Sequence, residues 1–286
     1  MTYLELVKRL RQETGVAGDG PSTVIGQSRE MKRLCDWIAQ SWVEIQEDQN
    51  DWLFLRKSVR FNTEYGTEVL SGDLTIGCVY EITTRVVLDF DTVGQLYTGT
   101  SNTAGAHYLI TSAATLGVGD SVKLVGKQTY TLADIGITDF AQWRNDSFRA
   151  YLKSAGIATQ IILTQYVDYS AFRDFYLLGS RQLVTGRPLY ITVAPDKSLV
   201  LGFTPNDVYV TSGEYFRTPQ VLTLDSDVPL CPGRFHMAIV YKAMQKYGVY
   251  ESAPEQVQAG KEGYSLMMSR LVIDQTPPIT MGGSLI

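Results

Sequence analysis

Four acidic side chains cluster where the second predicted helix ends: Glu44, Glu47, Asp48 and Asp51. A pair of carboxylates is what a glycoside hydrolase uses for acid–base and nucleophilic work, so Glu44 and Asp51 are the pair that a cell-wall hydrolase would use here. Acids at the carboxyl end of a helix oppose its dipole, however, and suit a solvated face or contact with a basic partner. The sequence therefore favours a charged surface over a hydrolytic site.

The other residue types that do chemistry are few and scattered. The two histidines, His107 and His236, fall in different segments, and neither has a metal-ligand partner at useful spacing. Cys35, Cys78 and Cys231 are odd in number and widely spaced, which predicts buried thiols rather than disulfides or a zinc site. No phosphate-binding loop, dinucleotide fingerprint, nucleophile elbow or HExxH motif occurs. We therefore predict no catalytic residue, no metal and no cofactor.

Charge and hydropathy narrow the class of protein further. The chain has 286 residues and a formal net charge of −5, which argues against a surface that grips nucleic acid and fits one past which DNA slides. The first fourteen residues are interrupted by charges and do not resemble a signal peptide, and no stretch is apolar enough to span a membrane. We expect a protein that is made and used in a cytoplasm.

Helical periodicity marks both ends of the chain. A short amphipathic helix is predicted over residues 3–13, and a second over 29–47 with Ser28 as its N-cap. The second helix carries a long apolar stripe that suits the core or a subunit interface. Two more helices are predicted near the carboxyl end, one from Pro232-Gly233 to Gly248 and one from Pro254 to Leu271. The candidate interface residues on the stripe are Met31, Ile38, Trp42 and Ile45.

The middle of the chain alternates like β-structure. Residues 64–127 predict a small all-β module with three basic and seven acidic residues, so nearly all of the chain's excess acid lies there. Its predicted strands carry the alternating sets Cys78, Tyr80, Ile82; Val86, Leu88, Phe90; and Ala106, Tyr108, Ile110. Further strands are predicted at 52–62, 128–132, 147–152 and 207–217, with a hairpin across Pro195-Asp196-Lys197 and a short helix capped by Ser170. The fold class is α+β, with a central antiparallel β region between the helices.

The last fourteen residues, 273–286, have no helical pattern and are predicted to form an extended tail. Disordered tails are usually polar and charged, whereas this one has a single acid and no base. An apolar extended segment suits docking on a neighbouring protein. The candidate docking residues are Ile273, Pro277, Pro278, Ile279, Met281, Leu285 and Ile286.

A family resemblance lies in segments spread over about three quarters of the chain. It begins with MTYLELVKRLRQETG and GPSTVIGQSREMKRLCDWIAQSWVEIQEDQNDWLFLR, resumes with YTLADIGITDFAQWRNDSFRAYL and TGRPLYITVAPDKSLVLGFTPNDVYVTSGEYFRTPQVL, and ends with PGRFHMAIVYKAMQKYGVYESAPEQVQAGKEGYSLMMSRL. These segments resemble head-to-tail adaptor proteins of tailed bacteriophages. Residues 64–127 interrupt the resemblance and are similar, in GDLTIGCVYEIT, DFDTVG and NTAGAHYLIT, to a small β module of phage structural proteins.

The resemblance implies a virion protein that assembles in the host bacterial cytoplasm. Such adaptors form a ring, commonly of twelve copies, that contacts itself, the portal protein and the next tail or neck protein. Double-stranded DNA passes through the ring without specific binding, and the carboxyl-terminal segment often reaches onto the portal. The implied domains are an adaptor core at 1–63 and 128–272, an inserted module at 64–127 and a docking tail at 273–286.

Three other functions stay open from the sequence. The chain could be another virion structural subunit, such as a tail-completion or baseplate protein. It could also be a cell-wall-degrading virion enzyme that uses the acids near Asp51. The inserted module could instead bind a host glycan, for which Tyr80, Tyr97 and Tyr108 are the available aromatic side chains.

Overall fold

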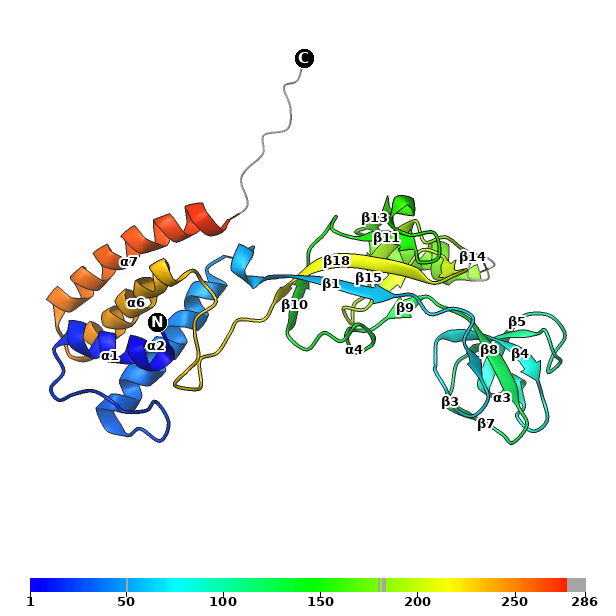
Figure 1. Cartoon of the computed structure of the whole chain (residues 1–286), viewed down its shortest axis with the longest axis horizontal. Coiled ribbons are helices and arrows are strands. Elements are labelled where there is room, and N and C mark those ends of the chain that lie inside the picture. Colours follow the sequence, from blue (N-terminus) through cyan, green and yellow to red (C-terminus); the bar gives the residue numbers. More distant parts are fainter. Residues whose placement is uncertain (50, 180, 182–183, 277–286) are drawn as a thin grey trace, which may run out of the picture. The chain divides into compact units, whose positions relative to one another are not determined.

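A computed structural model describes residues 1–49, 51–179, 181 and 184–276 (Figure 1). The chain divides into two compact units, which we describe separately: Met1–Arg56 together with Phe216–Ile286, and Lys57–Tyr215. Helices from the two ends of the chain pack together in the first unit, and β-sheets build the second. The predicted α+β class is confirmed.

The first unit, here called the helical unit, contains four long helices. Helix α1 begins with a capping box, in which Thr2 and Glu5 satisfy each other's backbone amides, and the αL residue Gly15 ends it. Ser28 occupies the predicted N-cap of α2, but its side chain makes no capping hydrogen bond. The elements are α1 (Tyr3–Thr14), α2 (Arg29–Glu47), η1 (Leu53–Leu55), η5 (Gly233–Phe235), α6 (His236–Tyr250) and α7 (Pro254–Gln275).

The apolar stripes of these helices meet in one core. Side chains of α1, α2 and α6 fill it, together with Trp52, Leu222 and Leu271. Burying a side chain of the size of Leu or Ile contributes roughly 1.5–3 kcal/mol, so this core is the main source of the unit's stability. The prediction that Gly248 ends α6 was wrong, because the helix continues to Tyr250 and Gly248 instead lies against Val257 of α7.

The second unit, here called the β unit, is built around two main sheets outside residues 64–127. One has the order β1-β18-β11-β12, with β10 also pairing with β18, and the other has the order β13-β15-β16-β9. Most pairs are antiparallel as predicted, but β13 with β15 and β14 with β17 are parallel. The strands are β1 (Arg56–Asn62), β9 (Thr129–Tyr130), β10 (Phe140–Trp143), β11 (Arg149–Leu152), β12 (Ile161–Ile162), β13 (Thr164–Tyr166), β14 (Thr185–Gly186), β15 (Tyr190–Val193), β16 (Leu199–Leu201), β17 (Thr204–Pro205) and β18 (Tyr209–Arg217).

Short helices and turns join these strands. The predicted hairpin is confirmed: β15 and β16 pair antiparallel from Val193 opposite Leu199, and Lys197 takes a positive φ in the turn. The predicted cap at Ser170 was wrong, because the carboxylate of Asp168 accepts the amides of Ser170 and Ala171 and an ionised acceptor makes the stronger cap. The helical elements are α4 (Leu132–Ile135), η2 (Ile157–Thr159), α5 (Tyr169–Phe172) and the π-helical turn η3 (Arg173–Leu177).

Residues 64–127, here called the inserted segment, form a five-stranded and a two-stranded sheet around a core of their own. Two of the three predicted alternations lie in β4 and around β6, with their alternate side chains buried. The third was wrong: Val86 and Leu88 lie in a loop, and Phe90 begins a helical turn. The elements are β2 (Glu68–Val69), β3 (Gly72–Leu74), β4 (Cys78–Thr84), α3 (Phe90–Val93), β5 (Gly94–Thr98), β6 (His107–Ile110), β7 (Ala114–Leu116) and β8 (Ser121–Lys127).

A polar cluster ties together the two ends of the inserted segment. The ammonium group of Lys127 lies 3.4 Å from Glu64 Oε1 and 2.8 Å from Asp134 Oδ1. The backbone amide of Glu64 donates to the hydroxyl of Tyr130. Entry and exit of the segment are therefore held side by side, as expected where a module interrupts neighbouring strands.

Candidate docking surfaces

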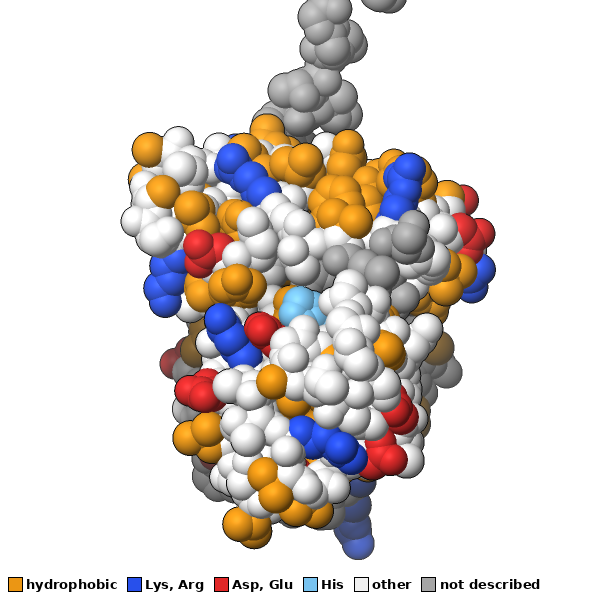
Figure 2. Space-filling model, turned by 90° about the vertical axis from the view of Figure 1, so that its right-hand side faces the viewer, with side chains coloured by type: hydrophobic (Ala, Val, Ile, Leu, Met, Phe, Trp, Pro, Cys, Tyr) orange, Lys and Arg blue, Asp and Glu red, His pale blue; other side chains and the backbone are white. Residues whose placement is uncertain are grey.

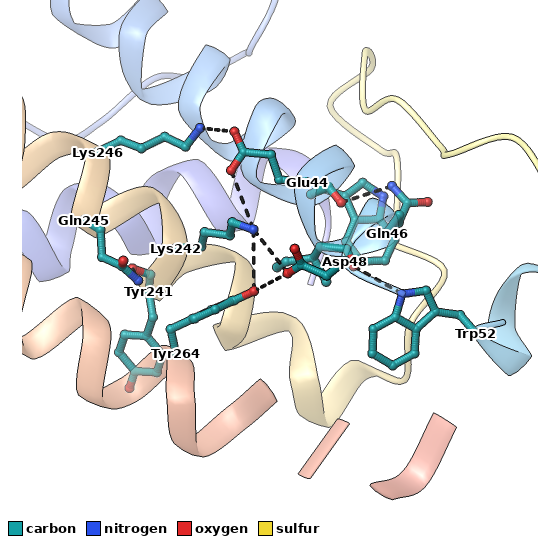
Figure 3. A network of polar contacts seen from close by, with 11 residues as sticks. Glu44, Gln46, Asp48, Trp52, Tyr241, Lys242, Gln245, Lys246 and Tyr264 are labelled. Atoms are coloured by element: carbon teal, nitrogen blue, oxygen red, sulfur yellow. Dashed lines mark hydrogen bonds and ion pairs between the residues drawn. The ribbon is translucent and has the colours of Figure 1, made fainter. Parts of the chain in front are cut away.

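The acidic cluster at the end of α2 is paired with lysines of α6 (Figure 3). Glu44 Oε1 lies 2.5 Å from Lys246 Nζ, and Glu44 Oε2 lies 3.6 Å from Lys242 Nζ. Asp48 lies 3.4 Å from Lys242 Nζ and accepts a hydrogen bond of 2.7 Å from the hydroxyl of Tyr264 on α7. Burial and the neighbouring carboxylate of Asp48 raise the pKa of the Tyr264 hydroxyl, which therefore stays a donor.

This network joins three helices and leaves Glu44 without a free carboxylate for catalysis. The sequence had suggested that the cluster faces a basic partner, and the basic groups belong to the same chain. Lys242 and Lys246 lie one helical turn apart, so the sequence could have shown that they share a face of α6. It could not have shown their acidic partners, which lie about 200 positions away in the sequence. The network fits a structural role, in which each carboxylate anchors α2 against α6 and α7.

The histidines and cysteines also have structural surroundings. His236 is buried at the start of α6, where Nε2 donates to the carbonyl of Cys231 and Nδ1 accepts from the Met1 amine. Burial, together with the positive charge of that amine, lowers the pKa of His236. All three cysteines are buried and unpaired, as predicted, and burial raises the pKa of the Cys78 thiol to about 11.

The predicted interface stripe on α2 needs correction. Ile38, Trp42 and Ile45 are each 1% exposed or less and pack in the core of the helical unit. A side chain that is already buried within its own subunit has no surface left to bury against a neighbour. Periodicity could not separate the two cases, because a core stripe and an interface stripe have the same spacing. Met31 is half-buried at the margin of the same core.

The first three residues of the predicted docking tail, 273–275, are helical. Helix α7 continues to Gln275, so Ile273 is helical, and its side chain is 82% exposed. The helix ends there because Pro277 disfavours helical geometry at the residue before it, and Thr276 is indeed extended, with ψ 147°. The other candidates lie outside the described residues: Pro277, Pro278, Ile279, Met281, Leu285 and Ile286.

An apolar groove lies beside the last turns of α7. It has a volume of about 550 Å³ and combines the hydrophobic side chains of Phe235, Met267 and Ile273 with the guanidinium groups of Arg234 and Arg270. Asp274 pairs with Arg234 at its margin. Because exposed apolar surface next to charged groups is typical of protein contact sites, this groove is a candidate docking surface.

The tyrosines of the inserted segment do not form a sugar-binding platform. Tyr108 is fully buried, and its hydroxyl donates to Asp91 at 2.6 Å. Tyr80 is also buried, and its hydroxyl accepts the amide of Thr75. Only Tyr97 of the three is half-exposed. Stacking on a sugar needs exposed ring faces, so the glycan-binding alternative loses two of its three residues.

The sequence analysis missed Asp120, which fixes two loops of the inserted segment. The Asp120 carboxylate is buried and accepts the backbone amides of Val86, Val87, Leu88 and Gly117 at 2.5–3.0 Å. Residues 86–88, which were predicted as part of a strand, are therefore held as a loop in which Val86 and Val87 are exposed. Val118, in the turn that carries Gly117 and Asp120, is exposed as well. Gly117 and Gly119 leave room for Val87 and Val86, and that glycine–aspartate spacing was the available signal.

A comparison with models of protein families shows which family the chain belongs to. The family model described as SU10 adaptor protein matches residues 1–281, nearly the whole chain. The chain belongs to the SU10 adaptor protein family. The predicted resemblance to phage head-to-tail adaptors is thereby confirmed, and the family that matches is described as an adaptor and not as an enzyme. A search of curated proteins finds no match.

The surface of this adaptor is mixed in charge where Figure 2 views it. Lys and Arg side chains lie among Asp and Glu side chains on that face rather than forming one basic surface. Among the described residues, none of the helices has both the length and the hydropathy needed to cross a bilayer. The mixed charge of this face fits a role in contact with other proteins of the virion.

Proposed function

We propose that this adaptor is the head-to-tail connector of a tailed bacteriophage. In this proposal it forms a ring of twelve copies beneath the portal, continues the DNA channel and offers a platform to the next tail or neck protein. Membership of the SU10 adaptor family over residues 1–281 is the observation that carries the proposal. DNA passes without specific binding, which fits the net charge of −5.

In the proposed mechanism the carboxyl-terminal segment docks on the portal. Residues 277–286 contain the apolar side chains predicted to bind there, and no lysine or arginine. Ordering such a segment costs roughly 1–2 kcal/mol per residue, so its apolar side chains must be buried on the partner to compensate. Repetition around a ring multiplies contacts that are weak singly.

Removal of residues 277–286 tests this role. The truncated adaptor should fold with an unchanged thermal midpoint, because α7 is complete at Gln275, but it should no longer bind portal-bearing heads. Co-sedimentation with purified heads, followed by electron microscopy of the head–tail joint, measures the binding. A matched control keeps the segment and replaces only Thr280 by Ser. Normal attachment of the truncated adaptor would contradict the docking role, and its presence at a baseplate rather than at the joint would contradict the connector function.

A further inference from the structure

The connection between β18 and α6 has an unusual distribution of polarity. In residues 218–231 the side chains of Gln220, Asp225 and Asp227 are half-buried and accept hydrogen bonds that hold the loop. Three apolar side chains of the same loop are exposed instead: Val221, Leu224 and Val228. Surface loops ordinarily have the opposite arrangement, because water satisfies polar groups at no cost. Such an inversion indicates a surface that is covered in the assembled state.

Gln220 anchors the first part of this loop. Its side-chain oxygen accepts from the indole of Trp42 and from the amide of Leu230, both at 3.1 Å. Its backbone exchanges two hydrogen bonds with the side-chain amide of Gln46, at 2.8 and 2.9 Å, and Gln46 is itself buried. The loop is thereby fixed on α2, and the buried Leu222 adds an apolar anchor.

Two aspartates fix the tip. Asp225 Oδ1 accepts the amide of Val24 at 2.6 Å. Asp227 Oδ2 accepts the amides of Thr223 and Leu224 at 2.7 and 2.8 Å, and these bonds lower the pKa of Asp227. The backbone oxygens of both aspartates also accept amides from the start of α1. The tip is therefore rigid and negatively charged.

Three apolar side chains stand out from this rigid tip. Val221, Leu224 and Val228 are 60%, 53% and 49% exposed. Because the backbone beneath them is already ordered, binding through them would not need to compensate for ordering a flexible loop. We refer to residues 221–228 as the acidic knob.

The groove beside α7 has the complementary character. Met267 and Ile273 offer apolar surface next to the buried Phe235. At the rim, Arg234 is paired with Asp274, so that Arg270 leaves a net positive charge there. Within the helical unit, Figure 1 shows the loop that carries the knob (yellow) and the end of α7 (red) on opposite sides of the helices. One subunit therefore cannot bring its own knob into its own groove.

We propose that the acidic knob of one copy of this chain docks into the α7 groove of the next copy. This inference rests on the proposed connector function and names the contact that would build its ring. The occupant is a second copy because the charges are complementary. The half-buried carboxylates of Asp225 and Asp227 make the knob negative. Arg270, beside the Arg234–Asp274 pair, makes the groove rim net positive. Different patches on opposite sides make a heterologous contact, which builds a ring when the rotation between neighbouring copies closes and an open filament when it does not; the proposed connector function requires the closed case.

Cross-linking in phage particles tests the contact. Leu224→Cys and Ile273→Cys are introduced together into the adaptor of otherwise wild-type particles, which are then treated with a short bismaleimide. The three native cysteines are buried and stay unreactive. We expect a ladder of covalent multimers from the double variant, no ladder from either single variant, and no ladder from a control pair of Leu224→Cys with Val249→Cys, whose valine is 71% exposed on α6.

A second set of variants removes the dependence on cysteine chemistry. Leu224→Asp and Ile273→Asp change exposed side chains, so the thermal midpoints of the two variants should not move. Each variant should nevertheless be missing from particles, because it places a charge in the proposed apolar contact. The control variant Val249→Asp should be retained in particles. Full retention of both aspartate variants would overturn the proposal. So would an adaptor with both cysteines that is present at the head–tail joint in normal amounts but does not cross-link. Absence of even the wild-type adaptor from the joint would instead refute the connector function.

Discussion

Asp120 shows how one buried carboxylate can decide the conformation of two loops. Burial alone would raise its pKa, but the amides of Val86, Val87, Leu88 and Gly117 donate to the ionised form and hold the pKa below its usual range. The side chain of Asp120 thus replaces strand pairing as the partner of these amides. Alternation in the sequence predicted a strand at 86–90, because periodicity reports hydrophobic spacing and not the partners of the backbone.

Substitution of Asp120 by Asn should loosen these loops. The amide group retains one acceptor oxygen and puts a donor against backbone donors, so the change should cost about 2–4 kcal/mol of local stability. Hydrogen exchange of residues 84–90 and 116–121 measures the effect. The control Glu68→Gln removes the same charge from an exposed position in the segment. Equal protection in Asp120→Asn and wild type would show that the four hydrogen bonds contribute nothing.

Buried His236 predicts a pH dependence for the helical unit. Its pKa lies below the ordinary value of 6.5 because burial disfavours the imidazolium. The unfolded chain takes up the proton first as pH falls, so the free energy of unfolding should fall below about pH 6.5 and level off once the folded pKa is passed. Urea unfolding between pH 7.5 and 5 measures this slope. His236→Gln should remove part of the slope, and an identical pH profile in that variant would assign the dependence to other groups.

At the scale of elements, glycines set how closely α6 and α7 approach. A Cβ at Gly260 would lie 2.9 Å from the backbone oxygen of Tyr241, and one at Gly263 would lie 2.8 Å from the Tyr241 ring. Gly248 meets the backbone of Val257 in the same way. Glycine disfavours a helix interior by roughly 0.5–1 kcal/mol relative to alanine, so its presence here reflects packing and not helix propensity.

Alanine at Gly260 should therefore destabilise the helical unit. The obstacle is backbone, which cannot move aside cheaply, and overpacking of this kind costs about 1–3 kcal/mol, more than alanine gains in propensity. A lower urea midpoint checks the prediction. Ser265→Ala, on the exposed side of α7, is the control and should leave the midpoint nearly unchanged. A more stable Gly260→Ala variant would show that the helices can separate without cost.

For the whole molecule, the chain path separates two tasks. The helical unit takes both ends of the chain, and the β unit is a single continuous stretch, Lys57–Tyr215. The helical unit carries the acidic knob, the groove and the attachment of residues 277–286, so the proposed contacts with other copies and with the portal all belong to it. The exposed valines of the inserted segment, Val86, Val87 and Val118, lie in the β unit. Truncation and cross-linking thus probe assembly without touching the sheets.

The sequence by itself determined the local features of this adaptor. Helical periodicity located α1 and α2 within a residue or so, alternation located β4 and β6, and the turn at Pro195-Asp196-Lys197 located a hairpin, because each depends on neighbours within a few residues. Family resemblance indicated the class of protein. The sequence analysis ended α7 at Leu271, whereas the helix continues to Gln275. Pro277 could have located this end, because a proline disfavours helical geometry at the residue before it.

Only the tertiary structure decided which of these features face solvent. Glu44 and Asp48 are paired with Lys242 and Lys246, the apolar stripe on α2 lies in the core, and Gln220 of the loop at 218–231 is bonded to α2. Each outcome depends on residues some 170–200 positions apart that meet only after folding. Spacing along a chain records which residues could share a face, whereas burial and pairing are properties of the packed molecule.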